Sequence, residues 1–409
     1  MIQTEYIKTH TMKKIYISLL FIISGLFSFG QTYDVYVENI INAVNLDSLI
    51  QQMRNLSGED AVVINDESTY IEHRVSNWGN NLAAEYIFET LNSYGLAAEK
   101  QTYSMGGINV VAVQPGTLYP DEYIMICAHY DAVDYYCADD NASGTAAVLE
   151  AARIFSELEF EYSIIYALWD EEEIGLIGSA DYAAEAASNG DIINAVINMD
   201  MISWDSDGDH VAEIHTSYDA NSNVLADYIV DMNSIYGLDI TTDIINPGAP
   251  YSDHSSFWNN DYPAILIIEE YYGGDFNPYY HTEQDRIAIL NMDYFHEMSK
   301  LCIGTVAQQS ALDVNVGTEE SMANGISEMR IFPNPATDYA QLKLELTKAQ
   351  NARISILNTV GQEILVVQDD YLSQEINTIQ LPLQSLTTGI YLVKIEVENG
   401  VSTQKLMVR

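Results

Sequence analysis

The feature that most constrains the fold is a buried strand that runs into an acidic loop and then into a helix. The hydrophobic run 123–127 predicts the strand, which places His129 and Asp131 at its carboxyl end. Asp140 follows at the start of a predicted helix over 142–156. Ligands of open α/β sheets gather at the carboxyl ends of strands, so a histidine and carboxylates there suit a divalent metal. A hydrogen-bonded histidine and a helix N-cap would explain one such stretch equally well.

The same pattern recurs at later strand ends, which favours the metal site. Further buried strands are predicted at 162–169, 192–199 and 263–268, beside an earlier one at 108–113. Four consecutive acids, Asp170–Glu173, follow the first of these three, and they repel one another unless a cation lies among them. The second runs into Asp200, and His281 comes after the third.

Segments with helical periodicity separate these strands. They lie at 78–94, 142–156, 176–187, 219–235 and 285–309. Strands that alternate with helices predict an α/β domain with a mostly parallel, helix-flanked sheet. We assign residues 31–312 to this domain.

The periodicity changes beyond the polar, turn-rich segment 313–328, which we interpret as a linker. Leu342, Leu344 and Leu346 then alternate with polar residues, as the half-buried strands of an antiparallel sheet do. We therefore expect residues 329–409 to form a small all-β sandwich domain.

The first thirty residues have the pattern of a secretory signal. Met12 opens a basic region, and the apolar run 15–29 is too short to span a bilayer comfortably. A small residue, Gly30, lies where a signal peptidase would cleave. We expect residues 1–30 to comprise upstream residues and a signal peptide, and the mature protein to have no stable transmembrane segment.

Charge and cysteine content exclude several classes of protein. A net charge of -44 argues against nucleic acid and anionic membranes as partners, because phosphate neutralisation requires Lys and Arg. Three cysteines exclude a disulfide scaffold. Cys127 and Cys137 are close enough in sequence to form one bridge, which the expected burial of Cys127 disfavours.

Five motifs make roughly residues 35–312 resemble the M28 family of zinc exopeptidases. They are His129-Tyr-Asp131, Ala138-Asp-Asp-Asn-Ala-Ser-Gly144, Glu172-Glu-Ile-Gly-Leu-Ile-Gly178, Asn198-Met-Asp200 and Tyr280-His-Thr282. The resemblance implies two Zn²⁺ ions bridged by Asp140, with Asp139 as the neighbour that could be confused with it. It implies that His129 and Asp200 complete one site, and that Glu173 and His281 complete the other.

The resemblance also implies roles in catalysis. A hydroxide bridging the metals would attack the scissile carbonyl of an N-terminal residue, with Glu172 as general base. Asp131 would orient His129, and Tyr280 would help to hold the developing oxyanion. Glu172 and Glu173 are adjacent, so an exchange of their roles stays open.

An exopeptidase must recognise one end of a peptide. A carboxypeptidase needs a cation for the terminal carboxylate, and Arg286 is the only basic residue close to a site motif. An α-ammonium group instead suits a site full of carboxylates, which favours an aminopeptidase acting on peptides or proteins with free N-termini. A metallo-carboxypeptidase, a glutaminyl cyclase-like acyltransferase and a catalytically dead binding domain are the alternatives.

Two further segments of the domain have weaker signals. Residues 251–257 are expected to line the pocket, with His254 as a hydrogen-bonded structural histidine and not a metal ligand. Asp205–Asp209 offers closely spaced oxygens that would suit Ca²⁺, although a solvated turn explains them as well.

Residues 329–409 resemble the C-terminal sorting domain of the type IX secretion system of Bacteroidetes. The motifs are Ile331-Phe-Pro-Asn-Pro-Ala-Thr-Asp338, Gly389-Ile-Tyr-Leu-Val393 and Lys405-Leu-Met-Val408. The resemblance implies an outer-membrane translocon and a sortase-like enzyme as partners, and a protein that is secreted or attached to the cell surface. Composition alone would also fit a β-sandwich adhesion module.

Overall fold

The computed structural model describes two stretches of the chain. These are residues 33–311, apart from 76, 104–105 and 219–221, and residues 325–408, apart from 333–335, 337–338, 359–362, 375, 385, 387–388 and 399. The predicted signal peptide and most of the predicted linker lie outside the described residues. Each stretch holds its own hydrophobic core, so we describe them separately.

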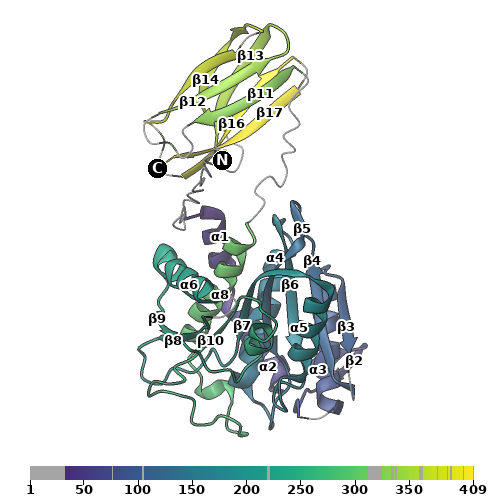
Figure 1. Cartoon of the computed structure of the whole chain (residues 1–409). Coiled ribbons are helices and arrows are strands. Elements are labelled where there is room, and N and C mark those ends of the chain that lie inside the picture. Colours follow the sequence, from purple (N-terminus) through teal and green to yellow (C-terminus); the bar gives the residue numbers. More distant parts are fainter. Residues whose placement is uncertain are drawn as a thin grey trace, which may run out of the picture. The chain divides into compact units, whose positions relative to one another are not determined.

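The first stretch contains the helices and most of the strands expected from the sequence (Figure 1). Its helices are α1 (Val35–Ala43), α2 (Leu46–Leu56), α3 (Asn77–Ser93), α4 (Gly144–Phe155), α5 (Ile177–Asn189), α6 (Ser222–Tyr236), α7 (His254–Trp258) and α8 (Met292–Gln309), with short helical turns η2 (Ala138–Ser143) and η4 (Ile287–Ile289). Its strands are β1 (Val62–Ile64), β2 (Glu67–Thr69), β3 (Ala98–Thr102), β4 (Ile108–Gln114), β5 (Tyr119–His129), β6 (Tyr162–Trp169), β7 (Ile192–Met199), β8 (Val211–His215), β9 (Thr241–Ile245) and β10 (Ala264–Ile268).

Eight of these strands form one sheet in the order β3-β4-β6-β5-β7-β10-β8-β9. The central strands β6, β5, β7 and β10 are parallel to one another. β4 is antiparallel to both of its neighbours, and β8 is antiparallel to β10. The prediction of an α/β domain with a mostly parallel, helix-flanked sheet is confirmed. The carboxyl ends of the parallel strands therefore meet at one edge of the sheet.

Helices cover both faces of the sheet, because alternate residues of the central strands point to opposite faces. In β5, Ile124 and Ile126 join the larger core with helices α2, α3, α4, α6 and α8, whereas Met125 and Cys127 join a smaller core with α5 and α7. Full burial of one such aliphatic side chain contributes about 1.5–3 kcal/mol. The sheet is thus anchored on both sides, and its strand ends have fixed positions.

Some element boundaries differ from those expected. The helix predicted over 285–309 begins only at Met292, where the side chain of Asn291 accepts the N–H of Tyr294 as an N-cap. The preceding residues are held elsewhere, because Asp285 is hydrogen-bonded to the loop that precedes α4. The short strands β3, β8 and β9 were not expected, since they carry many polar residues.

The second stretch is a pair of antiparallel sheets around one core. Its strands are β11 (Ile326–Phe332), β12 (Tyr339–Leu346), β13 (Gln350–Leu357), β14 (Glu363–Leu372), β15 (Ile376–Pro382), β16 (Gly389–Val397) and β17 (Gly400–Val408). The sheet orders are β11-β12-β15 and β14-β13-β16-β17. Leu342, Leu344 and Leu346 are buried, as the alternation predicts. β11 begins at Ile326, inside the segment assigned to the linker, and the domain boundary stays a prediction.

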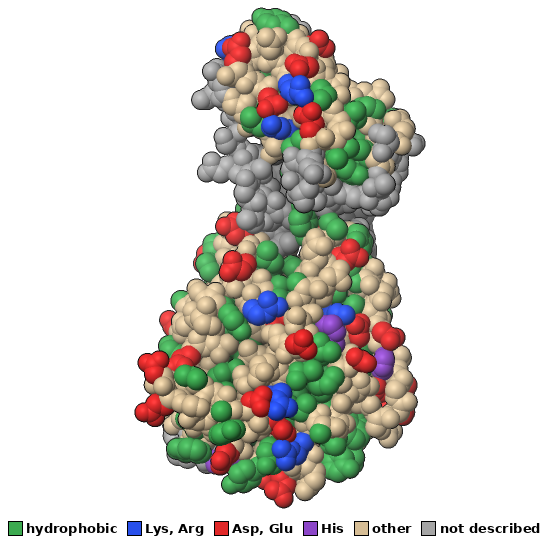
Figure 2. Space-filling model, turned by 180° about the vertical axis from the view of Figure 1, so that it is seen from behind, with side chains coloured by type: hydrophobic (Ala, Val, Ile, Leu, Met, Phe, Trp, Pro, Cys, Tyr) green, Lys and Arg blue, Asp and Glu red, His purple; other side chains and the backbone are tan. Residues whose placement is uncertain are grey.

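The described surface fits the acidic composition. Acidic side chains are spread over the face shown in Figure 2, with fewer Lys and Arg among them. Within the described residues, no helix combines the length and the apolar character that crossing a membrane requires.

Candidate metal centre

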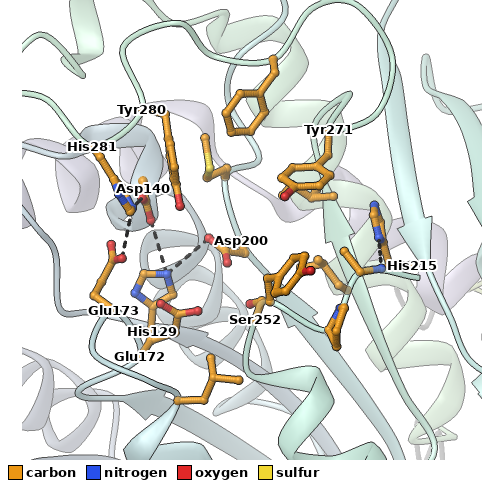
Figure 3. A pocket seen from close by; sticks show the side chains of 18 of the residues that line it. His129, Asp140, Glu172, Glu173, Asp200, His215, Ser252, Tyr271, Tyr280 and His281 are labelled. Carbon is orange, nitrogen blue, oxygen red and sulfur yellow. Dashed lines mark hydrogen bonds and ion pairs between the residues drawn. The ribbon is translucent and has the colours of Figure 1, made fainter. Parts of the chain in front are cut away.

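The predicted site residues come together at the carboxyl edge of the parallel strands (Figure 3). His129 ends β5, Glu172 and Glu173 follow β6, and Asp200 follows β7. Asp140 lies in η2, and His281 comes from the loop after β10. Asp131 and Tyr280 lie beside them, so all of the predicted catalytic and metal-ligating residues are neighbours.

His129 has its two ring nitrogens in different surroundings. Nε2 lies 3.4 Å from Oδ1 of Asp140 and 3.3 Å from Oδ1 of Asp200. Nδ1 lies 3.4 Å from Oδ1 of Asp131 and 3.3 Å from its carbonyl oxygen. A proton on Nδ1 would therefore face Asp131 and leave the Nε2 lone pair toward the cluster, which is the arrangement of a histidine that binds a metal.

Asp140 lies between the two histidines. Its Oδ1 faces His129, and its Oδ2 is 3.2 Å from Nε2 of His281. The same nitrogen of His281 is 3.1 Å from Oε2 of Glu173. Ligand atoms converge in two groups, His129–Asp140–Glu173 and His129–Glu172–Asp200, each within 4.8 Å. His129 is common to both groups, and Asp140 belongs to the first.

Unpaired polar atoms show that the cluster fits a metal. Oδ2 of Asp140, Oε1 of Glu173 and Nε2 of His281 are buried and make no hydrogen bond within the described residues, although Nε2 lies at ion-pair distance from Asp140 and Glu173. Buried polar atoms are normally hydrogen-bonded, because desolvation without a partner is costly. All three are atoms of the kind that Zn²⁺ binds, so divalent cations would satisfy them.

Electrostatics in the cluster are those of crowded, buried carboxylates. Burial raises the pKa of Glu172 well above its ordinary value, and the nearby charges of Asp253 and Asp200 add to the effect. Burial, followed by the charge of Asp140, raises the pKa of Glu173 to about 7. Burial acts to lower the pKa of His129, but the carboxylates around it outweigh burial and raise that pKa. A bound cation would favour the ionised carboxylates.

Two further carboxylates hold the loops that carry the cluster. Asp131 accepts the backbone N–H of Glu172 at 3.1 Å and that of Glu173 at 3.2 Å. Oδ2 of Asp285, a residue that the sequence did not point to, accepts the N–H of Asp140 at 3.0 Å. These bonds fix the backbone immediately beside the acids of the cluster.

Asp139 faces away from the cluster. Its carboxylate accepts the N–H and hydroxyl of Ser203 at 3.0 and 2.6 Å and the side-chain amide of Asn277 at 3.0 Å. Its lone pairs are therefore engaged elsewhere. This arrangement favours Asp140 over Asp139 as a metal ligand.

Arg74 is a second residue that sequence reasoning missed. It is fully buried, and its guanidinium donates to the carbonyls of four residues at 2.6–3.0 Å; these are Leu56, Tyr130, Tyr136 and Cys137. Burial lowers its pKa. Arg74 thereby holds the segment between the end of β5 and η2. No motif surrounds it, so only the tertiary contacts reveal its role.

A pocket of about 320 Å³ opens from the cluster. Its apolar side is formed by Leu266 and Ile268 of β10 with Met201, Tyr271 and Phe276. The ring of Tyr280 stacks on His281 at 3.6 Å and is 41% exposed, so its hydroxyl can reach a ligand in the pocket. The described residues that line the pocket include no Lys or Arg.

The other residues considered in the sequence lie outside the cluster and make contacts within the protein. Arg286 pairs with Glu59 at 2.9 Å and lies over the ring of Tyr136. His254 is buried and donates from Nε2 to the carbonyl of Ala249 at 2.9 Å. Cys127 and Cys137 are free and buried.

The segment considered for calcium brings two of its acids together with a third from another loop. Asp205 and Asp207 group with Asp275, whereas Asp209 accepts the N–H of Val211 and is not in the group. Calcium there stays a prediction.

Comparison with known proteins assigns both stretches. Residues 109–306 match the model of Peptidase family M28, and residues 330–409 match that of the Secretion system C-terminal sorting domain. A probable leucine aminopeptidase of Trichophyton verrucosum is 24% identical over 294 residues, which are 67% of this chain and 78% of that protein.

Solved structures share the fold. A zinc aminopeptidase from Bacillus subtilis gives a TM-score of 0.56 at 13% identity, covering 66% of this chain and 96% of the other. A glutaminyl cyclase of Porphyromonas gingivalis gives 0.53 at 18% identity, covering 65% and 99%. At these identities the likeness concerns the fold alone. The expected resemblances of the two stretches to family M28 and to the sorting domain are both confirmed.

Proposed function

Since residues 109–306 are a peptidase domain of family M28, we propose that this chain is a secreted di-zinc aminopeptidase that removes apolar residues from peptide N-termini. The observation that carries the proposal is the position of Asp140 between His129 and His281. A carboxylate that faces a histidine with each of its oxygens is suited to bridge two metals.

The contacts support one division of the ligands. Asp140 would bridge, His129 and Asp200 would complete one zinc site, and Glu173 and His281 would complete the other. The resident ions would polarise the scissile carbonyl and lower the pKa of a water held between them.

Glu172 is the group we assign as general base. Its carboxylate would take a proton from the attacking water and pass it to the leaving amine. Glu173 lies 3.1 Å from His281, whereas Glu172 makes no ion pair with either histidine of the cluster within the described residues, which favours Glu172 for proton transfer. Burial raises its pKa, so it would hold the proton between the two steps. Asp131 would orient His129, and the hydroxyl of Tyr280 would donate to the developing oxyanion.

The charge and shape of the pocket support recognition of an N-terminus. Carboxylates surround the place where an α-ammonium group would lie, and no Lys or Arg among the described lining residues would hold a terminal carboxylate. Arg286, the cation that would suit a carboxypeptidase, is paired with Glu59. The apolar side formed by Leu266, Ile268 and Phe276 would receive the side chain of the first residue.

The C-terminal match supports export. A Secretion system C-terminal sorting domain over 330–409 implies handling by the type IX translocon and its sortase-like enzyme. The enzyme would then act outside the cell or at its surface, after removal of the predicted signal peptide.

The test uses the full mature chain with a panel of aminoacyl-4-nitroanilides. We expect turnover of apolar substrates that is abolished by chelation, restored by Zn²⁺ and accompanied by two zinc ions per chain. Inactivity on free N-termini together with cyclisation of N-terminal glutamine would instead identify a glutaminyl cyclase. Release of C-terminal residues would identify a carboxypeptidase.

A further inference from the structure

Behind the pocket lies a buried pair that the proposed chemistry does not use. Glu213 and His215 occupy alternate positions of β8, so their side chains share one face of the strand. They are 2% and 0% exposed. Figure 3 shows His215 at the end of the pocket away from His129.

The pair connects two loops that form different walls of the pocket. The N–H of Ala249 donates to Nδ1 of His215 at 2.9 Å, so this nitrogen is unprotonated. The proton therefore lies on Nε2, which donates to Oε2 of Glu213 at 2.8 Å. Oε1 of Glu213 accepts the N–H of Tyr272 at 2.7 Å. A continuous path of hydrogen bonds thus runs from the 249–252 wall to the 271–276 wall.

The strand that carries the pair is rigidly placed. β8 pairs with β10 on one side and with β9 on the other. We call Glu213 and His215 together the clamp. His215 is the register partner of Leu266, and Glu213 is the partner of Ile268, so the clamp lies directly beside the apolar side of the pocket. Neither residue contacts a member of the metal cluster in the described structure.

Ring contacts extend the clamp into the 271–276 wall. His215 stacks on Tyr272 at 5.5 Å and meets the edge of Tyr271 at 5.8 Å. Tyr271 in turn packs edge-on against Phe276 at 5.4 Å. Movement of the 271–276 wall would therefore break a hydrogen bond and ring contacts together, and movement of the 249–252 wall would break the hydrogen bond of Ala249.

We propose that Glu213 and His215 are positioning residues that fix the separation of the two pocket walls and so determine how bulky an N-terminal side chain the enzyme accepts. This inference rests on the proposed aminopeptidase function. The physical reason is that a carboxyl group and an imidazole with fixed hydrogen-bond partners allow one spacing, whereas apolar contacts would allow several.

Two substitutions and one matched control test the clamp. Glu213→Gln keeps the shape but presents an amide to the Nε2 proton of His215 or to the N–H of Tyr272, so one bond is lost. His215→Phe keeps the ring and removes both hydrogen bonds. Asp243→Asn is the control, because Asp243 is the exposed register partner of Glu213 on β9.

Two readouts are measured on the zinc-loaded full chain. The first is the ratio of kcat/KM for leucyl- and alanyl-4-nitroanilide, and the second is the ratio of Kd for free leucine and alanine by calorimetry. In Glu213→Gln and His215→Phe we expect the leucyl-to-alanyl ratio of kcat/KM to fall about tenfold, through a higher KM for the leucyl substrate, and the leucine-to-alanine ratio of Kd to rise about tenfold. For the control Asp243→Asn, we expect both ratios and kcat for the alanyl substrate to match the wild type.

Unchanged ratios in both variants would overturn the clamp, and so would an equal loss on both substrates with unchanged Kd ratios. Thermal unfolding of each variant identifies one that fails to fold, and the other then decides. If the wild type hydrolyses neither substrate, the proposed function fails, while the Kd ratios still test the clamp.

Discussion

Asp131 accepts the backbone N–H of Glu172 at 3.1 Å. The same carboxylate faces Nδ1 of His129 and accepts the N–H of Glu173. One side chain therefore fixes both a histidine at the end of β5 and the acidic loop after β6. Its effect on the site is positional, since it reaches the cluster only through the residues that it holds.

Replacing Asp131 with Asn should weaken metal binding. The amide keeps one oxygen for a backbone N–H but sets its own N–H₂ against the second donor. We expect the affinity for Zn²⁺ to fall about 10- to 100-fold, measured by competition with a chromophoric chelator. Asp134→Asn, a change of the same kind outside the cluster, is the control. An unchanged affinity for Asp131→Asn would show that His129 and the loop are positioned without this carboxylate.

Changing Glu172 and Glu173 to Gln one at a time should affect zinc content and kcat differently. Glu172→Gln should retain two zinc ions while kcat falls about 10²- to 10⁴-fold, because a general base is lost. Glu173→Gln should lose one zinc, because a ligand to that ion is lost. Zinc analysis and steady-state kinetics on both variants decide the matter. The opposite pattern would mean that the two residues exchange roles.

The sequence predicted the central strands and the acids at their ends, but not the residues that hold the surrounding loops in place. The strands at 162–169 and 192–199 could be predicted from largely apolar runs, and the acids after them from their position at the strand ends. Arg74, Asp285 and Glu213 carried no such signal. Each acts through contacts with residues far away in the chain, and only the folded structure brings those partners together.

Arg74 should be important for stability. Lysine cannot reach four carbonyl oxygens with one ammonium group, so Arg74→Lys would leave buried acceptors without donors. We expect a loss of about 2–4 kcal/mol in the free energy of unfolding of the metal-free protein, measured by urea denaturation. Arg54→Lys, at a solvent-exposed pair with Asp60, should change stability little. Equal stability of the two variants would contradict the role given to Arg74.

The metal-free protein should become less stable as the pH rises from about 4 to 7. Asp253 is buried without a hydrogen-bond partner for either carboxylate oxygen, and burial raises its pKa from 3.8 to about 7. The folded state therefore binds more protons than the unfolded state in this interval. The contribution of the protonated Asp253 to the free energy of unfolding is complete below pH 4 and is lost as the pH approaches 7. For this one group the effect is on the order of a few kcal/mol.

Urea denaturation at several pH values, with and without Zn²⁺, measures this dependence. Asp253→Asn should have a smaller slope than the wild type, because the titrating group is gone. Some slope should remain, since burial also raises the pKa of Glu173 and Asp285, to about 7 and about 8. If stability changes with pH as steeply in Asp253→Asn as in the wild type, Asp253 is not a source of the pH dependence.

The side chains of the cluster come from five separate segments between residues 129 and 281. Cations held by all of them would act as a set of cross-links between distant parts of the polypeptide, and they would close long loops in any partly opened state. Local opening at one strand end would then require release of the ions, whose binding favours the closed state. The supply of zinc would thus control the lifetime of the enzyme among extracellular proteases, as well as its activity.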